Sequence, residues 1–212
     1  MYLCFVELWS KHRQLRKNNI NLLPIRASTL FEVRGFTFLY NMNTSKIQKL
    51  LLNHLSNRQD FNILTTNYSW ALHFEADVFQ VKKNGFIVEY EIKSSRGDFL
   101  KDFKKSKKIF NGHNYDVVKK HDWLVTDGLM SKSSCNKFKP NEFYFVCPSG
   151  LISAQEIPKS YGLIHVMESG QVCIMKRPKK LHKRKELSNL DIINIARNFT
   201  LKQCSLINKT KS

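Results

Sequence analysis

The chain has 212 residues, 42% of them apolar, which suffices for one globular domain with a core and extensions at its ends. Lys and Arg number 35 against 17 Asp and Glu, so the net charge is +18 and a polyanion is the natural partner. A cationic protein that is merely soluble is the alternative, because charge bears on association and not on fold. No apolar run approaches the ~20 residues that span a bilayer, which excludes a transmembrane helix.

The cysteines and the N-terminus bear on the compartment. The five cysteines are odd in number and lack the spacing of a zinc site or a redox pair. Met1–Trp9 is apolar, but it is too short for a signal sequence and carries Glu7. We therefore expect a reduced, cytoplasmic protein without membrane association.

Composition and periodicity divide the chain into three parts. Residues 1–41 show no clear period and are expected to be an N-terminal extension. Residues 42–175 carry alternating helix and strand patterns and are expected to form the main domain. Residues 176–212 begin with a basic run and continue as a helical pattern from Leu187 to about Leu201.

The first predicted helix starts at Thr44 or Ser45, either of which can serve as its N-cap, and ends near Asn57. Residues 70–93 then read as two strands joined at Lys83-Asn84-Gly85, since Asn-Gly supplies the positive φ angles of a tight hairpin turn.

A second helix is predicted to run through about Phe110, with Ser94, Ser95 and Asp98 as candidate N-caps, phenylalanines on one side and lysines on the rest. Because this basic surface follows the polar hairpin directly, we expect it to contact DNA phosphates. The expected DNA-binding residues are Lys101, Lys104, Lys105, Lys107 and Lys108.

Further short apolar runs predict strands at 123–125, 143–146, 162–166 and 172–175. Together these elements indicate an α/β fold with a mixed central sheet of about five strands and helices on both faces.

The candidate catalytic residues lie on the predicted hairpin of residues 70–93. On its second strand, Glu89, Glu91 and Lys93 share one face. With a two-residue turn, Asp77 would point to the opposite face, away from Glu91. A β-bulge at Val78 or Phe79 would correct this and place Asp77 opposite Glu91 and Glu75 opposite Lys93.

Two carboxylates that face each other across a ribbon repel unless a cation lies between them, and hard oxygen ligands suit Mg²⁺. Such an ion polarises a phosphodiester, while Lys93 orients or helps to deprotonate a water, or neutralises the transition state. The alternative is a solvent-facing sheet surface on which Glu and Lys form weak cross-strand pairs.

Asp77 followed by Glu91-Ile92-Lys93 resembles the PD-(D/E)xK nuclease superfamily. A closer similarity, to MmcB-like DNA repair nucleases and related phage-encoded proteins, runs through EIKSSRGDFLKDFKK, FYFVCP and IPKSYGLIHV, within residues 44–185. The resemblance implies a restriction-endonuclease-like core.

The resemblance also implies a magnesium-dependent deoxyribonuclease in which Mn²⁺ can substitute. Asp77 and Glu91 would be metal ligands, Lys93 the catalytic lysine and Ser94 a supporting polar group. Many superfamily members add a Glu from the first helix, which here offers Asn53 and His54, so Glu75 is the candidate for that role. A DNA-binding protein that does not cut, or an RNA-associated basic protein, remains the alternative.

Overall fold

The computed structural model describes residues 42–68, 74–110, 114–126, 139–182 and 187–209. The chain divides near residue 40 into two units, and all of the described residues belong to the second, Tyr40–Ser212. The predicted N-terminal extension and the predicted strand start at Trp70 lie outside the described residues. None of the helices that the structure describes has the length and apolar character needed to cross a bilayer.

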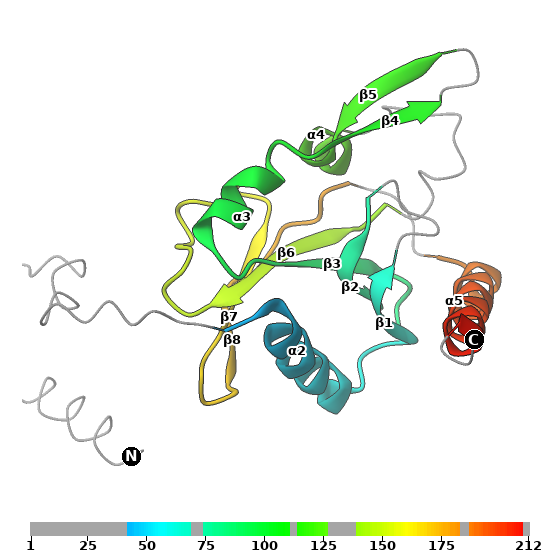
Figure 1. Ribbon diagram of the computed structural model, residues 1–212, viewed down its shortest axis with the longest axis horizontal. Helices are drawn as coiled ribbons and strands as arrows, with labels where there is room; N and C mark the ends of the chain where they lie inside the picture. Colours follow the sequence, from blue (N-terminus) through cyan, green and yellow to red (C-terminus); the bar gives the residue numbers. More distant parts are fainter. Residues whose placement is uncertain (1–41, 69–73, 111–113, 127–138, 183–186, 210–212) are drawn as a thin grey trace, which may run out of the picture. The chain divides into compact units, whose positions relative to one another are not determined.

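The second unit is built on a six-stranded mixed sheet with the strand order β1-β2-β3-β6-β7-β8 (Figure 1). Strands β3, β6 and β7 run parallel, and the pairs at both edges are antiparallel. The α/β prediction is therefore confirmed, with one strand more than the expected five. The strands are β1 (Ile63–Tyr68), β2 (Ala76–Val81), β3 (Ile87–Ile92), β6 (Glu142–Pro148), β7 (Gly162–Val166) and β8 (Val172–Lys176).

Helices cover both faces of the sheet, so each face has its own apolar core. Helix α2 (Thr44–Arg58) buries Ile47, Leu51 and Leu55 against Val88 on one face. The helices α3 (Arg96–Asp102), α4 (Lys120–Val125) and α5 (Asn189–Lys209) contribute to the core on the other face. A central strand such as β3 is consequently buried on both sides, and any polar side chain on it must find a partner there.

The first helix ends one residue beyond the predicted Asn57, but its cap was predicted wrongly. Asn43 is the N-cap, because its Oδ1 accepts a hydrogen bond from Lys46 N at 2.9 Å. Thr44 and Ser45 are already inside the helix. The helix ends in a left-handed Gln59.

The prediction of one helix through about Phe110 was wrong. Helix α3 has Ser95 as its N-cap and stops at Asp102, and the chain continues into β4 (Ser106–Phe110). Strand β4 pairs with β5 (Tyr115–Lys119) in a separate two-stranded sheet. Five lysines within two turns of one helix repel one another, which disfavours a continuous helix. The valines of β5 favour a strand, and pairing with β5 holds residues 106–110 in an extended conformation.

Two other predictions also differ from the structure. The predicted strand at 123–125 is instead part of α4, which buries Trp123 and Leu124. A run of three apolar residues does not distinguish a strand from a buried helical turn. The C-terminal helix is longer than predicted, and its Ile195 is fully buried in the core of the same unit.

Candidate active site

The β2–β3 hairpin sets Asp77 opposite Glu91 without the predicted bulge. Its ladder is regular from Val78 opposite Tyr90 to Val81 opposite Ile87. The turn is one residue longer than the predicted two-residue turn, because Lys82 N donates to Phe86 O at 2.8 Å and residues 83–85 lie between them. The bulge prediction was therefore wrong. Continuing this register by one residue places Asp77 on the same face as Glu91.

A bulge was expected because apolar residues change phase between Val78 and Phe79. The structure explains this change by burial on both faces. Val78 packs in the core beneath α2, whereas Phe79 packs in the core on the α3 side. Phe79 pairs with Glu89, so an aromatic residue and the polar residues share the α3 side of the sheet.

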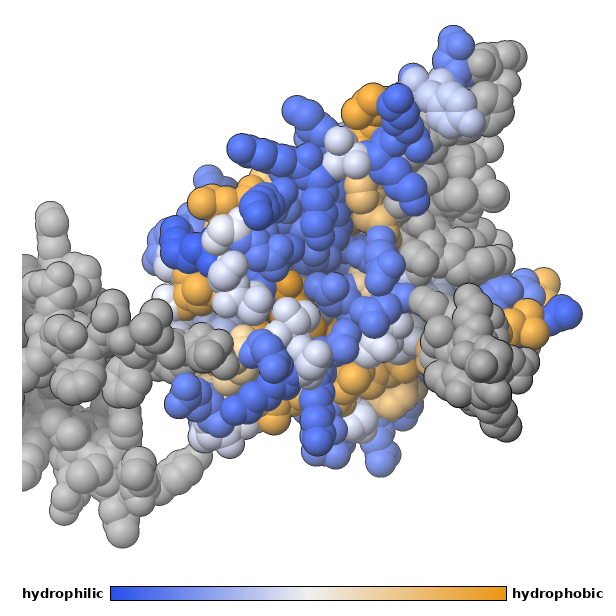
Figure 2. All heavy atoms as spheres, in the orientation of Figure 1, coloured by the Kyte–Doolittle hydropathy of each residue, from blue (hydrophilic) through white to orange (hydrophobic). Residues whose placement is uncertain are grey.

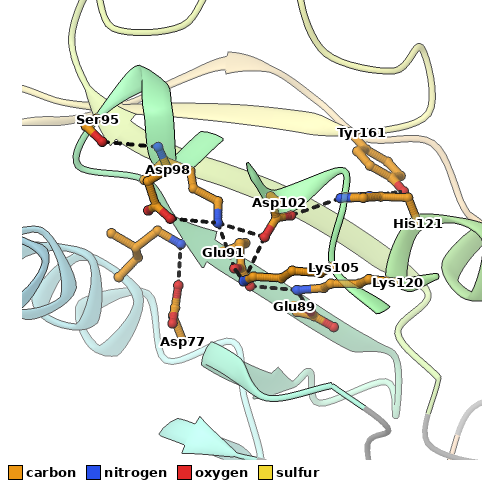
Figure 3. A network of polar contacts seen from close by, with 12 residues as sticks. Asp77, Glu89, Glu91, Ser95, Asp98, Asp102, Lys105, Lys120, His121 and Tyr161 are labelled. Carbon is orange, nitrogen blue, oxygen red and sulfur yellow. Dashed lines mark hydrogen bonds and ion pairs between the residues drawn. The ribbon is translucent and has the colours of Figure 1, made fainter. Parts of the chain in front are cut away.

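Glu91 is 2% exposed and binds three lysine ammonium groups (Figure 3). Its Oε1 accepts hydrogen bonds from Lys93 at 2.9 Å and from Lys105 at 2.5 Å. Its Oε2 accepts one from Lys120 at 2.7 Å. Burial alone would raise the pKa of Glu91, but Lys120, Lys93 and Lys105 together hold it below its ordinary value, against the opposing effect of Asp102. Glu91 is thus a stable carboxylate in a buried position.

Asp102, at the end of α3, is a second buried carboxylate and shares two of these lysines. Its Oδ1 lies 2.7 Å from Lys93 Nζ and 2.7 Å from Lys105 Nζ. Its Oδ2 lies 2.9 Å from His121 Nε2, and the other ring nitrogen of His121 lies 2.9 Å from the Tyr161 hydroxyl. Burial raises the pKa of Asp102, yet the bond to His121 and the charges of Lys120 and Lys93 bring it well below its usual range.

Lys120, at the start of α4, is fully buried and joins two carboxylates of β3. Its Nζ lies 2.8 Å from Glu89 Oε1 and 2.7 Å from Glu91 Oε2. The contact with Glu89 is an ion pair without hydrogen-bond geometry, and neither oxygen of Glu89 has a hydrogen-bond partner among the described residues. Burial raises the pKa of Glu89 to about 7, and Lys120 opposes this rise.

Asp77 lies at the solvent-facing side of the same network. Its Oδ2 accepts a hydrogen bond from Ile92 N at 2.7 Å, and Gln48 of α2 donates to its backbone oxygen at 2.8 Å. Burial and the charge of Glu91 raise the pKa of Asp77 to about 6, against the Ile92 bond, Lys120 and Lys93. A carboxylate held close to another carboxylate in this way gains most from a bound cation.

The structure brings together Asp77, Glu91 and Lys93, which the sequence predicted as the catalytic group. Glu75 is exposed and precedes β2, whereas Lys93 is buried, and Glu75 takes part in none of the described contacts of Lys93. Ser94 is half-buried beside the network and takes part in none of the hydrogen bonds described. Gln48, rather than Asn53 or His54, is the residue of the first helix that reaches Asp77.

Of the lysines predicted to bind DNA, only Lys105 enters the network, and its side chain is 43% exposed. The others are exposed, and two of them belong to β4 rather than to a helix. Figure 2 shows hydrophilic side chains gathered over α3 and the β4–β5 hairpin. These other lysines are Lys101, Lys104, Lys107 and Lys108.

Three residues of the network were missed as site residues. Asp102 lies four residues after Asp98 on α3, and this helical spacing was the available signal for Asp102. Lys120 and His121 gave none, because they reach the site only through the folding of β5 and α4 back onto the sheet.

The donor set fits a magnesium ion of the kind that shares its ligands with substrate and water. Asp77 has one carboxylate oxygen outside the described hydrogen bonds, whereas both oxygens of Glu91 accept from lysines, so Glu91 would have to release a lysine in order to bind an ion. Among the described residues, no three acidic, His or Cys side chains form a complete metal-ligand set. Mg²⁺ is commonly held by one or two carboxylates together with phosphate oxygens and water, so two carboxylates suffice.

Comparisons with known proteins identify no family for this chain. No protein-family model matches the chain, and no curated protein matches its sequence. Among solved structures, the chain is similar to a protein of unknown function from Silicibacter pomeroyi. The identity is 15%, the match covers 81% of this chain and 94% of the other, and the TM-score is 0.49.

Proposed function

We propose that this protein is a magnesium-dependent nuclease that hydrolyses DNA phosphodiester bonds. One observation carries the proposal: Asp77, Glu91 and Lys93 lie together at the end of β3, where Lys93 donates to Glu91 at 2.9 Å and the charges of both act on Asp77. Buried charges destabilise a fold unless they are paired, and even paired they stabilise it little. Their concentration at a single point of β3 and α3 therefore supports a chemical role.

Lys93 is the residue that would act on the reacting phosphate. Two of its three ammonium hydrogens are used by Glu91 and Asp102, at 2.9 and 2.7 Å. The third has no hydrogen-bond acceptor among the described residues, the next carboxylate being Asp98 at 3.9 Å, and would be donated to a phosphate oxygen or to the attacking water. Because its two partners fix the ammonium group before substrate arrives, little reorganisation is needed as negative charge develops.

Asp77 and Glu91 would hold the magnesium ion, which supplies Lewis-acid stabilisation of the phosphate charge. The chain's own residues prepare this position. Ile92 N fixes the Asp77 carboxylate through a hydrogen bond of 2.7 Å, and Lys120 Nζ fixes the Glu91 carboxylate through a hydrogen bond of 2.7 Å to its Oε2. Lys105 faces solvent, so an incoming phosphate meets its ammonium group first and can draw it away from Glu91.

The surface next to the network supports a nucleic-acid substrate. On the β4–β5 hairpin, Lys108 and Lys119 share a face, since Ser106 pairs with Lys119 and Lys108 with Val117. A two-stranded ribbon of this kind fits the major groove of duplex DNA. The hairpin leaves the network directly after Lys105, which would place a bound backbone close to Glu91.

The test is incubation of the purified chain with plasmid DNA and with single-stranded DNA, each with Mg²⁺, with Mn²⁺ and with EDTA. Metal-dependent conversion of plasmid to nicked or linear forms, or loss of the single strand, is expected. Intact substrates under every metal condition would contradict the proposal.

A second candidate function is DNA binding without cleavage. The observation that favours it is the set of three ammonium groups around Glu91, which already neutralise this carboxylate. In that case the network would stabilise the fold, and the basic surface alone would bind DNA. The same incubation separates the two functions, since a binding protein retards DNA in a gel but leaves it intact.

A further inference from the structure

The face of the sheet opposite the candidate active site contains a pocket of about 200 Å³. It lies where α2 ends at Arg58, and its lining includes residues of α2 and of the sheet but of no other helix that the structure describes. We propose that this pocket binds a phosphate group, carried by a nucleotide or by a nucleic-acid strand. Nothing in the proposed nuclease mechanism uses it.

Two arginines give the pocket its positive charge. Arg58 comes from the last turn of α2 and Arg177 from the residue after β8. Both are exposed, and among the described residues neither guanidinium has a hydrogen bond or an ion pair. A guanidinium presents donors in a planar fork that matches two phosphate oxygens, so an unpaired pair of arginines is suited to this ligand.

Two tyrosines line the same pocket as the two arginines. Tyr144 stacks on Tyr90, with ring centroids 5.3 Å apart, and both rings line the pocket. Burial and Glu142 raise the pKa of Tyr144 to about 12, whereas Arg177 and Arg58 both oppose the rise. Each guanidinium is therefore close enough to act on the same hydroxyl.

The other charges of the pocket are one internal pair and one carboxylate. Lys82 and Glu142 neutralise each other at 2.7 Å. Asp60 also lines the pocket and is the charge that would oppose a bound anion. This arrangement predicts opposite effects of removing Asp60 and of removing either arginine.

The size of the pocket limits the ligand. A volume of about 200 Å³ is below the ~300 Å³ at which pockets for drug-sized molecules begin. The enclosed part of the ligand is therefore small, such as a phosphate with part of its sugar. The remainder of a nucleotide or strand would extend into solvent.

The experiment is isothermal titration of the full chain, without divalent metal, with three probes: inorganic phosphate, deoxyadenosine monophosphate, and a short oligonucleotide with and without a 5′-phosphate. Saturable binding of phosphate is expected. Arg58→Ala and Arg177→Ala should each weaken it by about tenfold, because each removes a charge-assisted hydrogen bond. Asp60→Asn should strengthen it.

Arg197→Ala is the matched control, since Arg197 is an exposed arginine on α5 outside the pocket, and it should bind like the wild type. A preference for the 5′-phosphorylated oligonucleotide would identify a terminal phosphate as the source. Equal binding of both forms, weakened by the same arginine substitutions, would identify the strand backbone. Absence of phosphate binding, or equal affinities for wild type and all variants, would overturn the proposal. Because no metal is present and no cleavage is measured, this result is independent of the nuclease test.

Discussion

Lys93 Nζ and Asp102 Oδ1 lie 2.7 Å apart, with side chains 1% and 0% exposed. Asp102 also holds His121 and Lys105, so one carboxylate fixes three partners from three parts of the chain. Removing one member of a buried ion pair leaves an uncompensated charge, and the cost of this is larger than the net stabilisation by the pair itself.

Asp102→Asn is therefore expected to lower the free energy of unfolding by about 3 kcal/mol at pH 7. Asp98→Asn is the matched control, because Asp98 is 46% exposed and 3.9 Å from Lys93, and it should cost less than about 1 kcal/mol. Urea denaturation of both variants measures the difference. Equal effects of the two substitutions would show that Asp102 is no stronger a partner than a surface carboxylate.

Lys120→Met is expected to destabilise the fold, because it leaves Glu89 and Glu91 facing each other without the ammonium between them. The expected loss is about 3 to 5 kcal/mol. Adding Glu89→Gln to the Lys120→Met variant removes one of the two carboxylates and should recover part of that loss. A double-mutant cycle by denaturation measures the coupling, and additive losses would contradict the ion pair.

Asp77 predicts a dependence of stability on pH. The pKa of its carboxyl is about 6 in the folded protein and 3.8 ordinarily, so the folded state holds its proton more firmly than the unfolded chain does. This favours folding below pH 4, and the advantage is lost as the pH rises through 6.

Asp77→Asn removes this loss of folding stability at high pH, because the amide does not ionise, while the amide oxygen still accepts the hydrogen bond from Ile92 N. In EDTA the variant should be more stable than wild type at pH 8, by about 1 to 3 kcal/mol. It should show no such advantage near pH 3.5. Denaturation curves across this range test the claim, and a constant difference at all pH values would contradict the raised pKa.

The basic hairpin predicts a salt-dependent affinity for duplex DNA. Replacing Lys107 and Lys108 with Ala should reduce the slope of log affinity against log salt by up to about 0.9 per lost phosphate contact. Lys46 and Lys49 on α2 are exposed and belong to the helix on the other face of the sheet, so their replacement is the matched control. If both pairs change the slope equally, the hairpin has no special part in binding.

The sequence predicted the parts of the fold that depend on local pattern. The β6 and β7 strands and the polar face of β3 follow from apolar runs and alternation. The β2–β3 register was predicted wrongly because the length of a turn is set by the pairing around it. One extra residue in the turn shifts the later strand pairs by one position, as a bulge in the strand would, and the sequence does not distinguish the two.

The candidate site was predictable only as far as it lies on one hairpin. Asp77, Glu91 and Lys93 are close in sequence, so strand periodicity groups them. Lys120 and His121 join through the β4–β5 hairpin, whose pairing is not local, and the expected long helix concealed it. Three-dimensional placement was needed to show that Lys105 belongs to the site rather than to the surface alone.

We propose that Lys93 serves cleavage and not DNA binding. The most direct measurement compares Lys93→Ala with Lys83→Ala, an exposed lysine at the opposite end of the hairpin, purified identically. Each variant is measured for plasmid cleavage with Mg²⁺ and for DNA affinity by gel retardation, after circular dichroism shows that it is folded. Lys93→Ala is expected to bind DNA with nearly wild-type affinity and not to cut, because one lysine among 35 basic residues contributes little to binding, whereas Lys83→Ala should do both. A folded Lys93→Ala variant that cuts at the wild-type rate would contradict this proposal.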